Sequence, residues 1–261
     1  MQQGRAHALR PLLTYQFTNR RRTMQHQANQ AAPRDHPVLA RRMALAAKYL
    51  TGDGIEIGAL HAPLPVPAAA RVKYVDRLDA AGLQGHYPEL AGQALTAVDI
   101  LDDGETLGTI ADGSLDFIIA NHMLEHCENP LGTVRNHFRK IRTGGVLYYA
   151  VPDMRFSFDN RRALTSMTHF VDDDKLGPAQ SRDSHFDEWV RLVEGISDAQ
   201  TLRATALRLK DIDYSIHFHV WDFDSFLYFV DLVRDQNPGL EFDWSHIELN
   251  QHEIISIFTK R

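Results

Sequence analysis

Acidic residues and a glycine stand where short apolar runs of this sequence end. Glu56 and Gly58 close the run that begins at Ile55. Asp76 closes the next run, about 20 residues further on, which is the spacing of a nucleotide-binding βαβ unit. A glycine at a strand end lets the backbone approach a ligand, and the later carboxylate can accept hydrogen bonds from ribose hydroxyls. The pattern therefore predicts a ligand that contains a nucleoside.

The turn after Gly58 differs from the glycine-rich turn that holds a pyrophosphate. It continues with Ala59-Leu60-His61-Ala62-Pro63 and lacks the pattern G-x-G-x-x-G. A helix start with a proline and no further glycine is poorly suited to a phosphate, and the carboxylate of Glu56 would repel one. A cationic ligand without phosphate fits better. S-adenosylmethionine (SAM), with its sulfonium and amino group, is such a ligand, so SAM and not NAD is predicted.

Two further polar groups come at the ends of later apolar runs. At Asp99 and Ile100 a carboxylate can accept the adenine amino group, and a backbone N–H can meet a ring nitrogen. Asn121 and His122 follow the fourth run, where the methionine part of the ligand is expected. A single acidic residue at a strand end is often only a turn or cap residue. Four groups in order with α/β spacing indicate a cofactor site more strongly.

A set of histidine and glutamate residues offers a metal site as an alternative. His122, Glu125 and His126 share one face if their segment is helical. With His217 or His219 they would form a nitrogen and oxygen site for Mg²⁺, Mn²⁺ or Zn²⁺. The same residues can line the pocket of a metal-free protein. A divalent metal is therefore the less favoured interpretation, and the sequence leaves it open.

The elements that must position these residues alternate along the chain. Strands are expected at 55–57, 72–75, 95–100, 115–120, 146–151, 240–249 and 253–259, and helices at 38–50, 130–141, 186–194, 199–210 and 223–233. This alternation predicts a Rossmann-like, doubly wound, mainly parallel α/β sheet of seven strands. The last two strands are separated by a short turn and are expected to form an antiparallel hairpin.

Two segments interrupt this alternation. Residues 1–35 are polar and include the run Arg20-Arg21-Arg22, so we expect a flexible or partly ordered N-terminal arm before a domain at 36–261. A docking segment for a partner is the alternative for this arm. Residues 153–220 are rich in Asp, Arg, His and Phe and follow the fifth strand. A polar insertion at the carboxyl edge of a parallel sheet is expected to form a cap over the substrate.

Composition limits the class of protein. The chain has 261 residues, 44% of them hydrophobic and 24% charged, and a net charge of −6, so a nucleic-acid partner is not expected. Cys127 is the single cysteine, which excludes an intrachain disulfide and fits a reducing cytoplasm. No run reaches the ~20 apolar residues of a membrane span. No pattern in the sequence indicates an oligomeric state.

Residues 54–151 resemble a class I SAM-dependent methyltransferase. The string Leu124-Glu125-His126, followed by Asn129-Pro130, is typical of that superfamily. Four later strings resemble a bacterial subgroup of it: Pro152-Asp153, residues 158–162, residues 165–169 and residues 215–221. Members of that subgroup are often encoded beside glycosyltransferases of surface-polysaccharide pathways. The resemblance covers most of the chain after Val38 and implies a sugar or glycan-precursor substrate.

Transfer of a methyl group to a sugar hydroxyl requires removal of the hydroxyl proton. A positioned histidine can contribute ~10²–10⁴-fold to such a step. The candidates are His126, His169, His185, His217 and His219. His217 and His219 alternate on a segment expected to be extended, so both would face one side of the pocket, opposite His126. We predict these three as catalytic, and a structural role in a hydrogen-bonded cap is the alternative for each.

The sequence thus predicts a cytoplasmic methyltransferase that uses SAM to methylate an oxygen of a small molecule or glycan precursor. A nucleic-acid or protein methyltransferase is an alternative that the negative charge disfavours. A SAM-binding regulatory module that has lost turnover is another, because a fold alone does not exclude it. The histidines of the insertion favour an enzyme, since a binding module has no need of acid–base groups.

Overall fold

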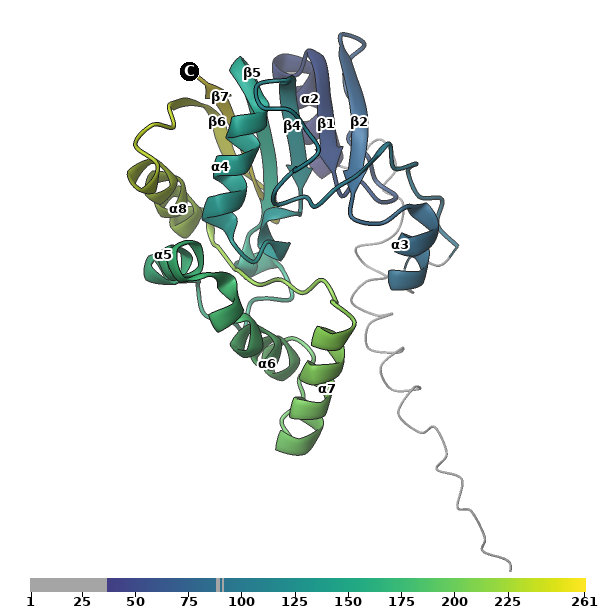
Figure 1. Cartoon of the computed structure of the whole chain (residues 1–261), viewed down its shortest axis with the longest axis vertical. Helices are drawn as coiled ribbons and strands as arrows, with labels where there is room; N and C mark the ends of the chain where they lie inside the picture. The colour runs from purple at the N-terminus through teal and green to yellow at the C-terminus, as the bar shows by residue number, and fades with distance from the viewer. Residues whose placement is uncertain (1–36, 88–89, 91) are drawn as a thin grey trace, which may run out of the picture. The chain divides into compact units, whose positions relative to one another are not determined.

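A computed structural model describes residues 37–87, 90 and 92–261 (Figure 1). The expected N-terminal arm at 1–35 lies outside the described residues. Contacts divide the chain into residues 1–40, of which only the start of helix α2 (Pro37–Tyr49) is described, and residues 41–261. All further elements belong to the second unit. No helix within the described residues is long and apolar enough to cross a membrane.

A seven-stranded sheet forms the centre of residues 41–261. Its strands are β1 (Gly52–Ile57), β2 (Ala70–Asp76), β3 (Ile100–Leu101), β4 (Leu115–Asn121), β5 (Ile141–Pro152), β6 (Phe242–Asn250) and β7 (Glu253–Lys260), in the spatial order β3-β2-β1-β4-β5-β7-β6. β1 to β5 pair in parallel, whereas β7 runs antiparallel to β5 and to β6. The predicted fold class, including the C-terminal hairpin, is confirmed.

Helices cover the central strands β4 and β5, each of which contains a continuous buried run. Phe117 to Ala120 of β4 are completely buried, as expected for a parallel strand that is covered on both faces. Helix α4 (Pro130–Lys140) begins at Asn129, whose side chain accepts a hydrogen bond from the Gly132 N–H. Helix α8 (Phe223–Gln236) begins with a capping box. Both helices contribute to the core cluster that includes β4 and β5.

The segment between β5 and α8 contains more helix than predicted. It holds α5 (Met167–Leu176), α6 (Arg182–Leu192), α7 (Ala199–Asp211) and the short 3-10 turns Met154–Phe156 and Pro178–Gln180. Side chains of α6, α7 and residues 216–218 form an apolar cluster of their own. In Figure 1 these helices lie beyond the arrowheads of β1, β2 and β4, at the carboxyl ends of the parallel strands. Helix α3 (Ala80–His86) follows β2.

Candidate functional site

The loop after β1 opens beside the carboxyl edge of the sheet. Gly58 has a φ of +67° and donates its N–H to the carbonyl of Val75, and a Cβ placed on it would meet nothing within 4 Å. The backbone of this turn is thus accessible to a ligand. The Glu56 carboxylate accepts the N–H of Leu64 with both oxygens at 3.0 Å and is 2% exposed. Burial raises the pKa of Glu56 to about 7, although the Leu64 N–H and Arg42 oppose the increase. Glu56 therefore folds the loop back onto β1.

Asp76 ends β2 where the sequence analysis places it. Its side chain is half-buried, and one oxygen accepts the Arg77 N–H at 2.7 Å. Burial raises the pKa of the Asp76 carboxyl, and hydrogen bonds from the Arg77 and Leu78 N–H groups oppose that shift. The carboxyl group lies at the same edge as Gly58, because the Gly58 N–H binds the carbonyl of the residue before Asp76. A ribose acceptor at this position fits the structure.

The placement of Asp99 and Ile100 at a strand end is wrong. Strand β3 contains only Ile100 and Leu101, which pair with Val75 and Asp76, so Asp99 precedes the strand. Its carboxylate accepts the N–H of Tyr74, 2.8 Å away, on the body of the sheet. The residue at the carboxyl edge is Asp102, whose N–H donates to the Asp76 carbonyl at 3.1 Å. The apolar run was placed too early because residues 95–99 are irregular.

Asn121 ends β4 with a buried side-chain amide. Both polar atoms of its side chain are buried and form no hydrogen bond to any residue that the structure describes. The amide nevertheless lies near enough to Glu56 to lower the pKa of that carboxyl slightly. A buried primary amide without a partner carries a free-energy cost that a polar ligand would remove. Asn121 thus offers both a donor and acceptors to a ligand at this edge.

His122 lies in a network that the sequence did not reveal. It has a φ of +52°, and its Nε2 is 2.9 Å from the Glu253 carboxylate while its Nδ1 is 3.3 Å from that of Glu125. Burial lowers the pKa of His122, but the two carboxylates outweigh this and raise it to about 9. Arg42 forms a two-bond ion pair with Glu253 behind it. His122 is therefore an imidazolium held between two carboxylates, and these contacts can fix the position of the loop after β4.

The observed residues fit SAM. An open backbone turn at Gly58, a carboxyl group at Asp76 and a buried amide at Asn121 lie at the ends of β1, β2 and β4, three adjacent strands. These groups match a nucleoside that carries an amino-acid arm. SAM would supply an electrophilic methyl group there, while these residues bind and orient it.

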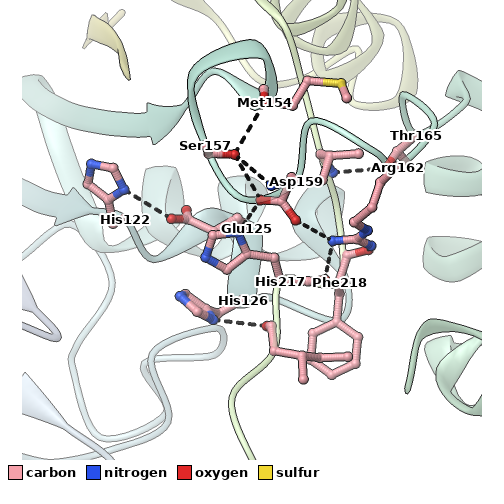
Figure 2. Close-up of polar contacts among 12 residues, drawn as sticks. His122, Glu125, His126, Met154, Ser157, Asp159, Arg162, Thr165, His217 and Phe218 are labelled. Carbon is pink, nitrogen blue, oxygen red and sulfur yellow. Dashed lines mark hydrogen bonds and ion pairs between the residues drawn. The ribbon is translucent and has the colours of Figure 1, made fainter. Parts of the chain in front are cut away.

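Glu125, His126 and His217 form what we call the edge cluster. Their ligand-capable atoms all lie within 4.8 Å of one another (Figure 2). Glu125 and His126 belong to the 3-10 turn Leu124–His126 after β4, and His217 comes from the chain that precedes α8. The Phe218 N–H donates to the Glu125 carbonyl at 2.8 Å and joins the two segments. The structure thus brings together residues that are far apart in the sequence, since Glu125 and His217 are separated by 92 positions.

His217 is oriented by a buried ion pair (Figure 2). Its Nδ1 lies 2.7 Å from the Asp159 carboxylate, and we assign the proton to Nδ1 because a carboxylate only accepts. Arg162 donates to Asp159 at 2.9 Å and to the His217 carbonyl at 2.7 Å. His217 and Arg162 hold the pKa of the Asp159 carboxyl below its usual range, although burial opposes this. The Nε2 atom of His217 is left as an acceptor.

His126 is held as a neutral acceptor. Its Nδ1 lies 2.9 Å from the Ile216 carbonyl and 3.0 Å from the Ser215 hydroxyl, so Nδ1 carries the proton and Nε2 accepts. Burial lowers the pKa of His126 to about 4, and repulsion from the His217 ring adds to this shift when that ring is protonated. Both oxygens of Glu125 are buried; Oε1 lies 3.3 Å from His122 Nδ1, and Oε2 has no hydrogen bond among the described residues. Within the edge cluster, three acceptors thus face one another.

The prediction that His217 and His219 face the same side is wrong. Phe218 and His219 both donate their N–H groups to the Glu125 carbonyl, at 2.8 and 3.3 Å. Consecutive N–H groups of an extended strand point to opposite sides, so the chain bends here and the alternation is lost. His219 is completely buried and joins His169, Asp173 and His185. These four residues are called the cap cluster.

Three residues that support the site escaped the sequence analysis. Asp159 orients His217, and Glu253 and Arg42 form the ion pair behind His122. Asp159 lies in a polar insertion that contains many acidic residues, so its type alone does not distinguish it. Its partner His217 is 58 residues away in the sequence. Glu253 is 131 residues from His122 and lies in the C-terminal hairpin. No local pattern connects such residues, because their contacts depend on the strand order.

Comparison with known proteins assigns the chain to a family. A methyltransferase-domain family matches residues 44–190, more than half of the sequence. No curated protein sequence matches it. Several solved structures are similar to this chain. One, provisionally named a SAM-dependent methyltransferase of Methanococcus maripaludis, is 14% identical with a TM-score of 0.46, over 98% of this chain and 97% of that one.

Two other solved structures have similarly low sequence identity to this chain. A SAM-dependent methyltransferase from Aquifex aeolicus is 10% identical, with a TM-score of 0.42, over 90% of this chain and 96% of its own. The YcgJ protein from Bacillus subtilis is 12% identical, with a TM-score of 0.45, over 86% of this chain and 97% of its own. All three TM-scores are below 0.5, so the assignment rests on the domain match. The chain belongs to the methyltransferase-domain family and is a class I SAM-dependent methyltransferase.

Proposed function

We propose that the protein transfers the methyl group of SAM to an oxygen of a small molecule, a sugar or a glycan precursor, with His217 as the general base. The observation that carries this proposal is the buried pair of Asp159 and His217 within the edge cluster. An acceptor hydroxyl must lose its proton as it attacks the methyl group. An imidazole with a fixed tautomer can receive that proton.

Each residue of the pair has a separate task in this proposal. Asp159 accepts the Nδ1 proton of His217 and thereby leaves Nε2 free to accept the hydroxyl proton. Arg162 binds both Asp159 and the His217 carbonyl, so it keeps the ring and the carboxylate in register. After transfer, Asp159 stabilises the imidazolium by its charge. Asp159 and Arg162 are thus positioning residues.

The cofactor contacts are proposed to lie along the carboxyl edge. Gly58, Asp76 and Asn121 would bind the cofactor directly, because an accessible backbone, a carboxyl group and a buried amide lie together at this edge. At the third strand Asp102 occupies the edge that Asp99 does not reach, and since its carboxylate accepts the Gly108 and Thr109 N–H groups, we place only a backbone contact there. Glu56 would hold the loop after β1 in place, and His122 would hold the loop after β4.

An acceptor with a sugar ring is supported by aromatic side chains near His217. The Phe158 ring lies 4.7 Å and the Trp189 ring 5.7 Å from the imidazole, measured between centroids. Phe158 is 44% exposed, which is unusual for a large apolar side chain beside a buried pair. Residues 153–220 would therefore form a cap whose aromatic faces stack on the apolar face of a sugar.

A metal-assisted version of the same reaction is favoured by one specific observation. Glu125, His126 and His217 present three acceptors within 4.8 Å, and both histidines bind outward through Nδ1. Metal-binding histidines commonly make such an outward bond to a carbonyl or carboxylate. A divalent ion there would lower the pKa of a bound hydroxyl in place of the general base.

Incubation with methyl-labelled SAM and a panel of nucleotide sugars and lipid-linked glycans tests the proposal. We expect label on a hydroxyl of one class of acceptor, with demethylated SAM as the second product. Activity that survives a chelator supports His217 as the base, whereas loss with recovery on adding Mg²⁺ or Mn²⁺ supports the metal-assisted version. Transfer only to protein or nucleic acid, or SAM binding without any transfer, would contradict the proposed acceptor class.

A further inference from the structure

The cap cluster gathers four residues from three parts of the chain. His169 and Asp173 are one turn apart on α5, His185 lies on α6, and His219 comes from the segment before α8. One ligand-capable atom of each lies within 4.8 Å of the other three. His169 is partly exposed, and the other three residues are buried. The proposed methyl transfer uses none of them.

The distances between these atoms match those of a tetrahedral metal site. His169 Nε2 is 3.0 Å from His185 Nε2 and 3.2 Å from Asp173 Oδ2, and His219 Nε2 is 3.7 Å from the same Oδ2. Ligands bound at about 2.0–2.1 Å in a tetrahedron are about 3.3–3.4 Å apart. The observed values lie on either side of that separation.

The three imidazole rings converge in the same way. Their centroids are 4.9 Å apart for His169 and His185, 5.2 Å for His185 and His219, and 5.5 Å for His169 and His219. The centroid of a bound imidazole lies about 3.2 Å from a tetrahedral zinc ion, which places two centroids about 5.2 Å apart. The rings are also steeply inclined to one another, at 64° to 84°.

Two buried polar atoms of the cap cluster lack a hydrogen bond of ordinary geometry within the described chain. They are Asp173 Oδ2 and His219 Nδ1. The other oxygen of Asp173 accepts the Ser181 hydroxyl at 2.6 Å, so the carboxylate is fixed with Oδ2 directed at the histidines. His219 Nε2 has only a 3.5 Å contact to the Glu128 carbonyl. The partners of this buried oxygen are the His169 and His219 rings, at 3.2 and 3.7 Å, and a cation would satisfy its charge more fully.

The protonation of the cluster suits a metal ion. Burial lowers the pKa of His185 to about 4 and the pKa of His219 well below its usual value, so both rings are neutral and can donate lone pairs. Burial tends to raise the pKa of Asp173, but its histidine and serine neighbours lower it overall, so it is charged. His169 Nε2 lies 3.2 Å from Asp173 Oδ2, and His169 would bind a metal as the neutral imidazole, with release of any proton on that nitrogen.

We propose that His169, Asp173, His185 and His219 bind one zinc ion that joins α5, α6 and the segment before α8. Three imidazoles favour a transition metal over Mg²⁺ or Ca²⁺, which prefer oxygen ligands. Four protein ligands complete a tetrahedron and leave no open position, which is typical of a structural site. The ion would also fix His219, two residues from His217, and thereby help to hold the proposed general base in place.

Metal analysis of the full chain, purified without an affinity tag and dialysed against buffer, tests this site. We expect about one zinc per chain, and cobalt exchanged into the protein should give the strong visible absorption of four-coordinate Co²⁺. His185→Gln and Asp173→Asn should each lower the zinc content to about one-tenth or less. His126→Asn and His217→Asn, which alter the edge cluster, are matched controls that should keep it.

The outcomes separate this proposal from the proposed function. If His217→Asn retains zinc but loses turnover, the result supports both the zinc site and the proposed methyl transfer. Zinc lost from the edge-cluster variants and retained in the cap-cluster variants would place the metal at the other site and overturn the inference. Fewer than about 0.1 zinc per wild-type chain after incubation with excess Zn²⁺ would show a hydrogen-bonded cluster without metal. If a cap-cluster variant does not fold, the cobalt spectrum of the wild type decides, because six-coordinate Co²⁺ absorbs far more weakly.

Discussion

The edge cluster and the cap cluster are made of the same residue types, histidines with one carboxylate, yet their surroundings differ. The edge cluster lies directly after β4, at the end of the sheet where the cofactor contacts are proposed. Its two histidines each direct Nδ1 away from the cluster to a fixed partner. The cap cluster lies between helices. Among the described residues, the Ser181 hydroxyl, which donates to Asp173, is its only side-chain hydrogen-bond partner from outside the cluster.

This difference separates a group poised to accept a proton from a group that needs a cation. His217 has Asp159 behind it, which fixes the tautomer of the ring and leaves Nε2 as the acceptor. His185 and His219 lie among other histidines, and burial keeps them neutral. The position of a histidine in the sequence is therefore a poor guide to its chemistry, whereas its hydrogen-bond partner is a good one.

The largest effect is expected from His217→Asn. Removal of the proposed general base should lower turnover by roughly 10²–10⁴-fold and leave SAM affinity nearly unchanged. His246→Asn, on β6 at the opposite edge of the sheet from the proposed cofactor contacts, is the matched control and should retain wild-type turnover. Steady-state kinetics and calorimetry on the same preparations measure both quantities. Wild-type turnover in His217→Asn would assign the residue a structural role.

A smaller but clear effect is expected from Asp76→Ala. Loss of hydrogen bonds to a charged carboxylate, worth about 1.5–3 kcal/mol, should weaken binding of SAM and of its demethylated product roughly 10–150-fold. Asp99→Ala is the matched control, since Asp99 binds Tyr74 on the body of the sheet. Titration calorimetry compares the two variants. An equal loss in both would show that general acidity, and not a specific contact, attracts the ligand.

The protonation of His122 predicts a modest dependence of stability on pH. Its pKa is raised to about 9 by the carboxylates of Glu125 and Glu253, which outweigh burial. A group with a raised pKa stabilises the fold fully below its unfolded pKa of about 6.5 and loses that contribution as the pH rises through about 9. The His122 side chain is 36% exposed, so solvent screening limits the effect to about 1 kcal/mol or less.

His122→Asn tests this dependence, because asparagine tolerates the positive φ of this position. The difference in unfolding free energy between wild type and variant should shrink from pH 6.5 to pH 9, as measured by urea denaturation. NMR titration of the His122 ring gives the pKa directly. A ring that titrates near 6.5 would mean that the two carboxylates do not hold the proton.

The smallest effect is expected at the ion pair between Arg71 and Asp53. Their side chains are 72% and 63% exposed, so solvent screens the attraction. Arg71→Gln should leave the free energy of unfolding nearly unchanged. Thermal or urea unfolding provides the measurement and a baseline for the buried pairs. A loss as large as that caused by Arg162→Gln would show that exposure is a poor guide to the strength of these pairs.

Much of the fold follows from local patterns in the sequence. The β4 run 115–120 is apolar because helices cover both faces, and α4 carries its own cap at Asn129, so both are readable without tertiary information. Strand β3 is only two residues long and was placed too early. Helix α5 escaped prediction because its polar residues, among them His169 and Asp173, face the cap cluster instead of solvent.

The candidate site was predictable only in part. Gly58, Asp76 and Asn121 end strands, and strand ends can be estimated from apolar runs. The separation of His217 from His219 depends on a bend at which two consecutive N–H groups share the Glu125 carbonyl, and no sequence pattern encodes that bend. Contacts that join β4 to the segment before α8 arise from the topology, so they require the structure.

A crystal structure of the protein with SAM bound tests the central claim most directly. The account predicts SAM along the ends of β1, β2 and β4, with its methyl carbon about 6 Å from His217 Nε2. That gap leaves room for an acceptor oxygen about 3 Å from both atoms. A sulfonium more than ~10 Å from the His217 ring, or SAM bound away from Gly58 and Asp76, would contradict the account, because direct proton transfer needs hydrogen-bond reach or one bridging water.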